Sequence, residues 1–176
     1  ETGDMSVFDD QWVAAMRLVV ATFREQQRFH GSGPYTFQRN TAWATDGVPM
    51  GGYGYPAKPN GLICSMFRPS DDATIYPYLI PSNYFAVESL LQLEAILLRK
   101  GGLQQDASAA KSQATQVSAA LKSHAITQHP TYGKIIAYET NGFGSYNLMD
   151  DANIPSLLSL PYLGAIKSGD PLYKQT

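Results

Sequence analysis

The sequence is poor in cysteine, in charge and in long apolar runs. Cys64 is the only cysteine among 176 residues, which excludes an internal disulfide and a cysteine-rich zinc site. Charged residues make up 16%, below the quarter usual for globular domains, and the 13 Lys and Arg form no cluster of the kind that nucleic-acid-binding proteins carry. No apolar run approaches the roughly 18 residues that span a bilayer. The composition therefore favours neither nucleic acid nor a membrane as a partner.

The first residues of the sequence do not resemble a targeting signal. They read ETGDMSVFDDQW, a polar and acidic stretch that is unlike a signal peptide. We expect any export signal to lie outside this chain. The sequence therefore does not determine the cellular compartment. A secreted or periplasmic location of a longer chain is compatible with this sequence.

Aromatic residues, in contrast, are plentiful, with 11 Tyr, 7 Phe and 2 Trp. Rings with a polar tip, in a weakly charged protein, suit neutral polar ligands such as sugars. The same composition also describes many ordinary cores. The aromatic residues are thus compatible with a carbohydrate ligand without requiring one.

Apolar periodicity predicts three long helices. The first covers residues 8–29, with Ser6 and Asp9 as a capping box. The second starts at a Ser82 cap, ends at Gly101 and is apolar almost all round, so we expect it to be buried on most sides. The third, residues 106–126, carries one narrow apolar stripe. A buried helix followed by a one-sided helix is typical of two concentric helical layers, and we expect helix in about half or more of the chain.

The remaining segments predict shorter elements. Residues 31–61 lack periodicity and are rich in Gly, Pro and Tyr, so we expect an irregular but ordered stretch. A strand is predicted over residues 134–140, a turn after it, and a short helix over 152–164. Asp170 and Pro171 have the residue types of a cap and a first helical position.

Two stretches each contain a pair of adjacent aspartates. Asp71 and Asp72 lie in the first stretch, residues 67–83, which reads FRPSDDATIYPYLIPSN. The second stretch, residues 149–158, reads MDDANIPSLL and repeats the Asp-Asp-Ala and Ile-Pro-Ser motifs. Adjacent carboxylates repel each other unless a partner such as Arg68 or backbone donors compensate. Such a site can hold one acid protonated near neutral pH, which a general acid requires.

Other interpretations of these residues remain open. The aspartates can cap helices or bind turn amides. A calcium site is a further alternative, although neither stretch has the alternating ligand spacing of a calcium loop. Glu139, at the end of the predicted strand, is equally a site carboxylate or a simple strand-end acid. A structural role is favoured for His30, His124 and His129, and a buried, inert one for Cys64.

Three stretches together resemble glycoside hydrolase family 125, the exo-α-1,6-mannosidases. They are FDDQWVAAM, GLICSMFRPSDDATIYPYLIPSNYFAVESL and IAYETNGFGSYNLMDDANIPSLLSLPYLG. The resemblance implies an all-α fold, the (α/α)₆ barrel. It further implies that residues 1–176 are the central part of a single catalytic domain. The N- and C-terminal parts would then belong to the remainder of the same domain, present in the same or another chain.

The resemblance also implies a reaction, the inverting removal of terminal non-reducing α-1,6-linked mannose from a manno-oligosaccharide or trimmed N-glycan, without cofactor or metal. The general acid would be Asp71, the first choice, or Asp72. The general base would be a Glu beyond Thr176, so this chain alone should be inactive. Substrate-binding residues would be Arg68, Ser70, Glu139, Asp150, Asp151 and Asn153. The alternatives are a non-catalytic carbohydrate-binding or scaffold protein of the same fold, and a metal-dependent phosphohydrolase.

Overall fold

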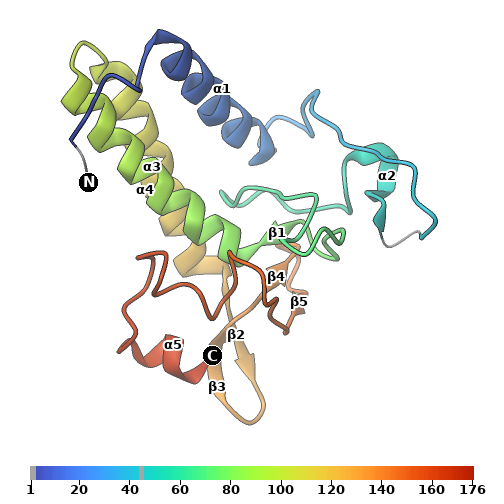
Figure 1. Ribbon diagram of the computed structural model, residues 1–176. Coiled ribbons are helices and arrows are strands. Elements are labelled where there is room, and N and C mark those ends of the chain that lie inside the picture. Colours follow the sequence, from blue (N-terminus) through green and yellow to red (C-terminus); the bar gives the residue numbers. More distant parts are fainter. Residues whose placement is uncertain (1–2, 44–45) are drawn as a thin grey trace.

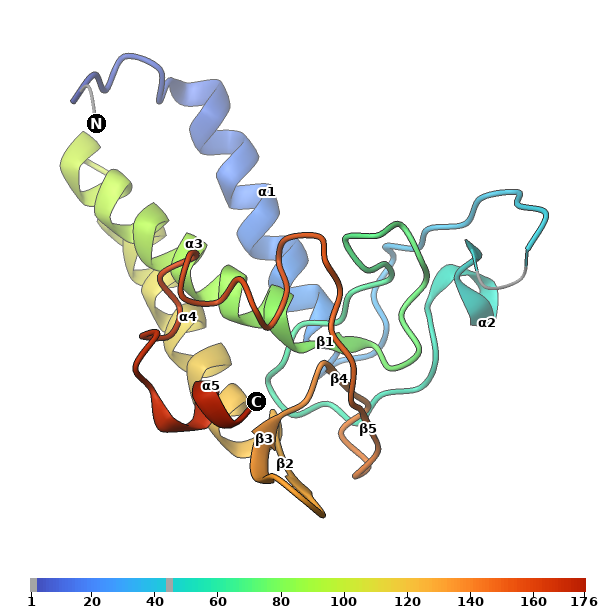
Figure 2. The same ribbon diagram turned by 60° about the horizontal axis from the view of Figure 1, so that its bottom comes forward.

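The computed structural model describes residues 3–43 and 46–176 of the chain, and its centre is a hairpin of two long helices. Helices α3 (Ile80–Lys100) and α4 (Gln104–His124) lie side by side, joined by a short connection, and α1 (Asp10–Gln26) packs against them (Figure 1). The segment from α1 to β1 extends away from these helices and carries the short α2 (Pro49–Gly52) at its far end (Figure 2). The predicted irregular stretch lies in this segment.

Helix α1 begins at a different cap from the one predicted. The carboxylate of Asp9 accepts a hydrogen bond of 2.7 Å from the amide of Trp12, so Asp9 and not Ser6 is the N-cap. An Asp cap is worth about 1 kcal/mol of helix stability. The helix is then fixed to α4 by two hydrogen bonds, of 2.8 and 2.7 Å, between Arg17 and Asp106.

Helix α3 begins before the predicted cap and ends where the sequence predicts. Its first residue is Ile80, whose amide donates to the carbonyl of Tyr138 at 2.8 Å, and Ser82 already lies in the first turn. Pro81 fits there because its missing N–H would have no intrahelical partner. Gly101 ends the helix with φ of +81°, as the glycine stop predicts.

The burial of the two long helices confirms one prediction and corrects another. The apolar stripe of α4 is buried, as predicted. Helix α3 buries one face against α4, but within the described residues two large apolar side chains outside this face are open, with Phe85 44% and Leu98 54% exposed. The prediction of burial on most sides is therefore wrong for this chain by itself. The buried residues include Ala110, Ala114, Val117, Leu121 and Ala125 from the stripe, and Ala86, Val87, Leu90, Leu93 and Leu97 from α3.

The strand predicted over residues 134–140 is two strands in two sheets. β2 (Ile126–His129) pairs with β3 (Gly133–Ile136) in an antiparallel hairpin. β4 (Glu139–Thr140) lies between β1 (Tyr78–Leu79) and β5 (Tyr146–Asn147). The division falls at Ala137 and Tyr138, whose amides donate to the carbonyls of Ala125 and Asn147.

The helix predicted over residues 152–164 is a series of turns instead. Pro161 lacks the amide that a continuous helix would require at that position. The last helix, α5 (Pro171–Gln175), follows its predicted cap, because Asp170 accepts from the amides of Leu172 and Tyr173. Helix makes up 40% of the chain, less than the half expected, because the connecting segments hold only short elements. Among the described helices, none has the length and apolar character needed to cross a membrane.

Candidate active site

The first Asp-Asp pair lies at the tip of a tight loop, residues 67–76, here called the acid loop. Phe67 and Ala73 form an isolated antiparallel bridge, and the amide of Arg68 donates to the carbonyl of Asp72 at 2.8 Å. Asp71 has φ of +73°, a left-handed conformation that aspartate adopts more readily than most residues. Both aspartates are exposed at the tip of the acid loop. The local sequence thus presents two carboxyl groups to the surroundings.

Asp71 is held by Arg39, a residue that the sequence did not single out. Nη1 of Arg39 donates to Oδ2 of Asp71 at 2.9 Å, and Nη2 donates to its carbonyl oxygen at 2.7 Å. The guanidinium also lies over the ring of Phe67, 4.8 Å from its centroid. Arg39 comes from the irregular segment, so no periodic pattern could relate it to the acid loop.

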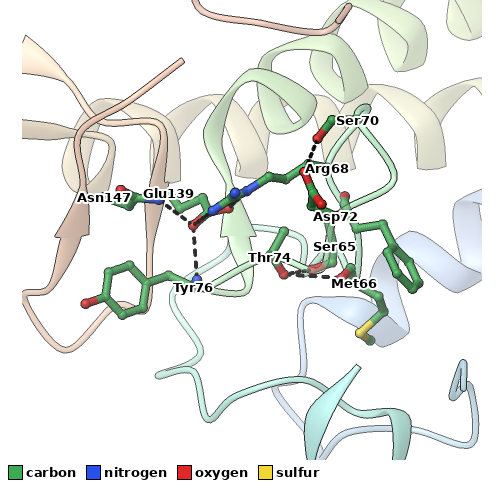
Figure 3. Close-up of polar contacts among 10 residues, drawn as sticks. Ser65, Met66, Arg68, Ser70, Asp72, Thr74, Tyr76, Glu139 and Asn147 are labelled. Atoms are coloured by element: carbon green, nitrogen blue, oxygen red, sulfur yellow. Dashed lines mark hydrogen bonds and ion pairs between the residues drawn. The ribbon is translucent and has the colours of Figure 1, made fainter. Parts of the chain in front are cut away.

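Arg68 turns away from the aspartates toward a buried glutamate (Figure 3). Its Nε and Nη2 donate to Oε1 and Oε2 of Glu139 at 2.7 and 3.2 Å. Oε2 also accepts from the amide of Tyr76 at 3.2 Å and from Nδ2 of Asn147 at 3.0 Å. The side chain of Glu139 has 0% exposure, so the expectation that it binds substrate is wrong for this structure. The glutamate supports Arg68, and its hydrogen bonds raise the pKa of that guanidinium.

The two Asp-Asp loops meet at Ser70. The hydroxyl of Ser70 donates to Oδ2 of Asp72 at 3.0 Å. The pKa of Asp151 is lowered, first by the backbone amide of Asn153 and next by hydrogen bonding from the Ser70 hydroxyl. A hydroxyl has one proton, so it serves one of these two carboxylates at a time. Asp151 therefore lies beside the acid loop.

Asp150 has a different role from its neighbour. Its two carboxylate oxygens accept from the amides of Leu157 and Leu158 at 2.8 and 2.9 Å. This is the turn-binding role that the sequence left open. The partner of Arg68 is Glu139 and not this acid pair. Asn153 is exposed and donates both its amides to Oδ1 of Asp151.

Tyr138 lies beneath this site and was missed by the sequence reasoning. It is fully buried, and the guanidinium of Arg68 lies 5.8 Å from the centroid of its ring. Burial, and then the charge of Asp151, raise the pKa of its hydroxyl, which has no hydrogen-bond partner among the described residues. Tyr78 is also a core residue, whereas Tyr53 and Tyr55 line a separate cavity of about 410 Å³.

The remaining candidate residues have structural roles. Nδ1 of His129 accepts from the amides of Thr131 and Tyr132 in the turn between β2 and β3. Cys64 is buried, and burial raises the pKa of its thiol to about 11. In the part of the chain that the structure describes, no three His, Cys, Asp or Glu side chains are grouped as metal ligands would be.

Comparison with known proteins identifies the family. The model of the glycoside hydrolase family 125, described as metal-independent alpha-mannosidases, matches residues 1–176, so the chain belongs to this family. It is 40% identical to the meiotically up-regulated gene 157 protein of Schizosaccharomyces pombe, covering 99% of this chain and 36% of that protein. The chain thus spans little more than a third of that relative's length.

A solved structure gives the same relationship. It is a Streptococcus pneumoniae member of a family of metal-independent alpha mannosidases, in a non-productive substrate complex with alpha-1,6-mannobiose. The identity is 37% and the TM-score 0.92, over 98% of this chain and 41% of the other. The all-α fold is therefore part of an (α/α)₆ barrel, as the sequence resemblance implied.

Proposed function

We propose that this chain is the central part of one catalytic domain, and that the complete domain removes terminal α-1,6-linked mannose from non-reducing ends with inversion. One observation carries the proposal. The acid loop presents two carboxyl groups beside a second acidic loop, in a chain that belongs to an α-mannosidase family. The related Streptococcus pneumoniae protein, solved with alpha-1,6-mannobiose, supports the linkage. The natural substrate would be a manno-oligosaccharide or a trimmed N-glycan.

The acid loop supplies the general acid in this proposal. Asp71 or Asp72 protonates the glycosidic oxygen as the bond to the leaving group breaks. Inversion requires a second carboxylate, about 6.5–9.5 Å away, to activate water. Glu139 cannot serve, because both its oxygens are engaged in a buried cluster. The base is then a Glu in the part of the domain outside this chain, and residues 1–176 alone have no turnover.

The surrounding polar groups bind the sugar. Asp151, Asn153 and Ser70 lie beside the acid loop and offer acceptors and donors for hydroxyl groups. Arg68 is 11% exposed, and its Nη1 has no partner among the described residues, so it is free to donate to a sugar hydroxyl. No cofactor takes part.

Hydrolysis of α-1,6-mannobiose by the complete domain, followed by proton NMR, tests the proposal. The first mannose formed should be the β-anomer, and α-1,2- and α-1,3-mannobiose should be cleaved far more slowly. A chelator should leave the rate unchanged. Initial release of the α-anomer would contradict inversion, and loss of activity with chelator would indicate a metal enzyme. Binding of the disaccharide without cleavage would favour the carbohydrate-binding alternative.

A further inference from the structure

Glu139 connects both ends of the acid loop to the sheet. It binds Arg68, which begins the acid loop, at 2.7 and 3.2 Å, and the amide of Tyr76, which ends it, at 3.2 Å. Asn147 on β5 holds the same carboxylate from the other side at 3.0 Å. A single buried side chain therefore holds both arms of the acid loop, through Arg68 and through Tyr76 (Figure 3).

The charge of Glu139 matters as well as its hydrogen bonds. Arg68 lies close enough to Asp72 for the aspartate's charge to raise the pKa of the guanidinium, after the larger effect of Glu139. By the same interaction, a guanidinium without a counter-charge would favour the ionised form of a neighbouring carboxyl. A general acid must keep its proton until the glycosidic oxygen takes it.

We propose that Glu139 is a positioning residue for the general acid. It clamps the acid loop through Arg68 and Tyr76, and its carboxylate balances the charge of the Arg68 guanidinium in the same ion pair. The mechanistic part of this inference rests on the proposed function. Glu139 itself touches no substrate, because it is fully buried.

The groups around Arg68 define what else can contribute. Glu139 pairs with it from β4, and the ring of Tyr138 lies 5.8 Å from it. The charge of Asp72, in the same loop as Arg68, has only a smaller effect on the pKa of the guanidinium. Asp150 and Asp151 lie near Tyr138 and so complete the charged surroundings. Removing the negative charge of Glu139 or the positive charge of Arg68 changes the net charge of this group in opposite directions. The two changes should therefore shift the pH profile of kcat in opposite directions.

Four variants of the complete domain test the inference, each assayed over pH with α-1,6-mannobiose. Glu139→Gln should lower kcat about 10–10²-fold, because the acid is displaced, with a smaller change in KM. The basic limb of its kcat profile should move about 0.5 pH unit down, since Arg68 is no longer neutralised. Arg68→Gln should move that limb up, and the double variant should return it near its original position. Glu139→Asp keeps the charge but is too short for the clamp, so it should lose kcat without moving the limb.

Two controls separate this role from loss of stability. Glu94→Gln makes the same chemical change at the partly exposed Lys111 pair, and should leave the profile unchanged. Val117→Ala removes buried volume in α4, and should lower stability without moving the limb. If Glu139→Gln does not fold, Glu139→Asp and the double variant, in which both charges are removed, test the same inference. The inference is overturned if the Glu139 variants behave like Val117→Ala and lose activity only in proportion to stability. It is also overturned if they keep the kcat and the pH profile of the parent.

A readout without turnover keeps the clamp distinct from the proposed function. Amide exchange over residues 68–76 should be faster in Glu139→Gln, because glutamine keeps only one of the two carboxylate oxygens that accept from Arg68 and from the Tyr76 amide. Exchange as slow as in the unchanged protein would contradict the clamp. If the parent domain has no mannosidase activity but exchange is still faster in Glu139→Gln, the proposed function is refuted. The clamp by Glu139 is then still supported.

Discussion

Two arginines hold the acid loop and differ in what they do at the level of single residues. Arg39 binds Asp71 at the exposed tip, through both its carboxylate and its carbonyl oxygen. Arg68 binds the buried Glu139 at the base. The contact of Arg39 supports the conformation of the tip, and the contact of Arg68 anchors the base of the acid loop. Their different exposure leads to different expected costs on removal.

Arg39→Ala should loosen the tip without unfolding the protein. The ion pair is solvent-exposed, with side chains 30% and 76% exposed, so the free energy of unfolding should fall by about 1 kcal/mol or less. Amide exchange at Asp71 and Asp72 should become faster, because the left-handed conformation loses its support. Arg99→Ala, which removes one hydrogen bond to the carbonyl of Gly3, is the matched control. Equal exchange in both variants would contradict this role of Arg39.

Cys64 gives a second prediction at this scale. Burial raises the pKa of its thiol to about 11, so at pH 8 the reactive thiolate is about 10⁻³ of the folded protein. Alkylation by iodoacetamide should therefore be at least about 10²-fold slower in the folded protein than in the unfolded one, whose thiol has a pKa near 8.5. The folded rate should rise with pH up to about 11. Rapid alkylation of the folded protein at pH 8 would show that the thiol is accessible.

At the scale of elements, the sequence predicted the long helices well and the strands poorly. The stripe of α4, the Gly101 stop and the Asp170 cap are local signals, and the structure confirms each of them. Strand β2 was missed because Ile126, its one apolar residue, continues the helical pattern of α4. Its pairing with β3 joins two segments, which no local pattern shows. The site follows the same division. The aspartate pairs were visible as motifs, whereas Arg39 and Glu139 reach the acid loop across 32 and 71 residues of sequence.

Helix α1 offers a test of how one element docks on another. Asp106→Asn removes the solvent-exposed ion pair between Arg17 and Asp106 and should lower the free energy of unfolding only slightly. Hydrogen bonds from Arg17 lower the pKa of Asp106 below 3.8, so its contribution is present above that value. It is lost as the pH falls through the lowered pKa. In denaturant unfolding, the difference in stability between variant and parent should therefore be larger at pH 7 than at pH 2. An equal difference at both would contradict the ion pair.

At the scale of the whole molecule, the open face of α3 is the main feature left without a partner in the described residues. The chain spans 36% and 41% of the two relatives compared. We expect the remainder of the barrel to cover this face, since Phe85 and Leu98 are apolar and 44% and 54% exposed. Burial of such side chains is the main driving force of helix packing in a barrel.

Leu98→Asp in the complete domain tests this expectation. A charge placed in a covered apolar interface should lower the free energy of unfolding by more than about 2 kcal/mol. Ser112→Asp, at an exposed polar position of α4, is the control and should change it by less than about 0.5 kcal/mol. Equal stability of the two variants would show that the face of α3 stays in water.

The aspartate pair of the acid loop tests the central claim most directly. Turnover of α-1,6-mannobiose by the complete domain is measured for the parent, Asp71→Asn and Asp72→Asn, together with binding of the disaccharide. One of the two variants should lose about 10²–10⁴-fold in kcat, the usual contribution of a general acid, while binding largely survives because the amide keeps the shape. If both variants keep turnover near that of the parent, the general acid lies elsewhere and the assignment of the acid loop is wrong.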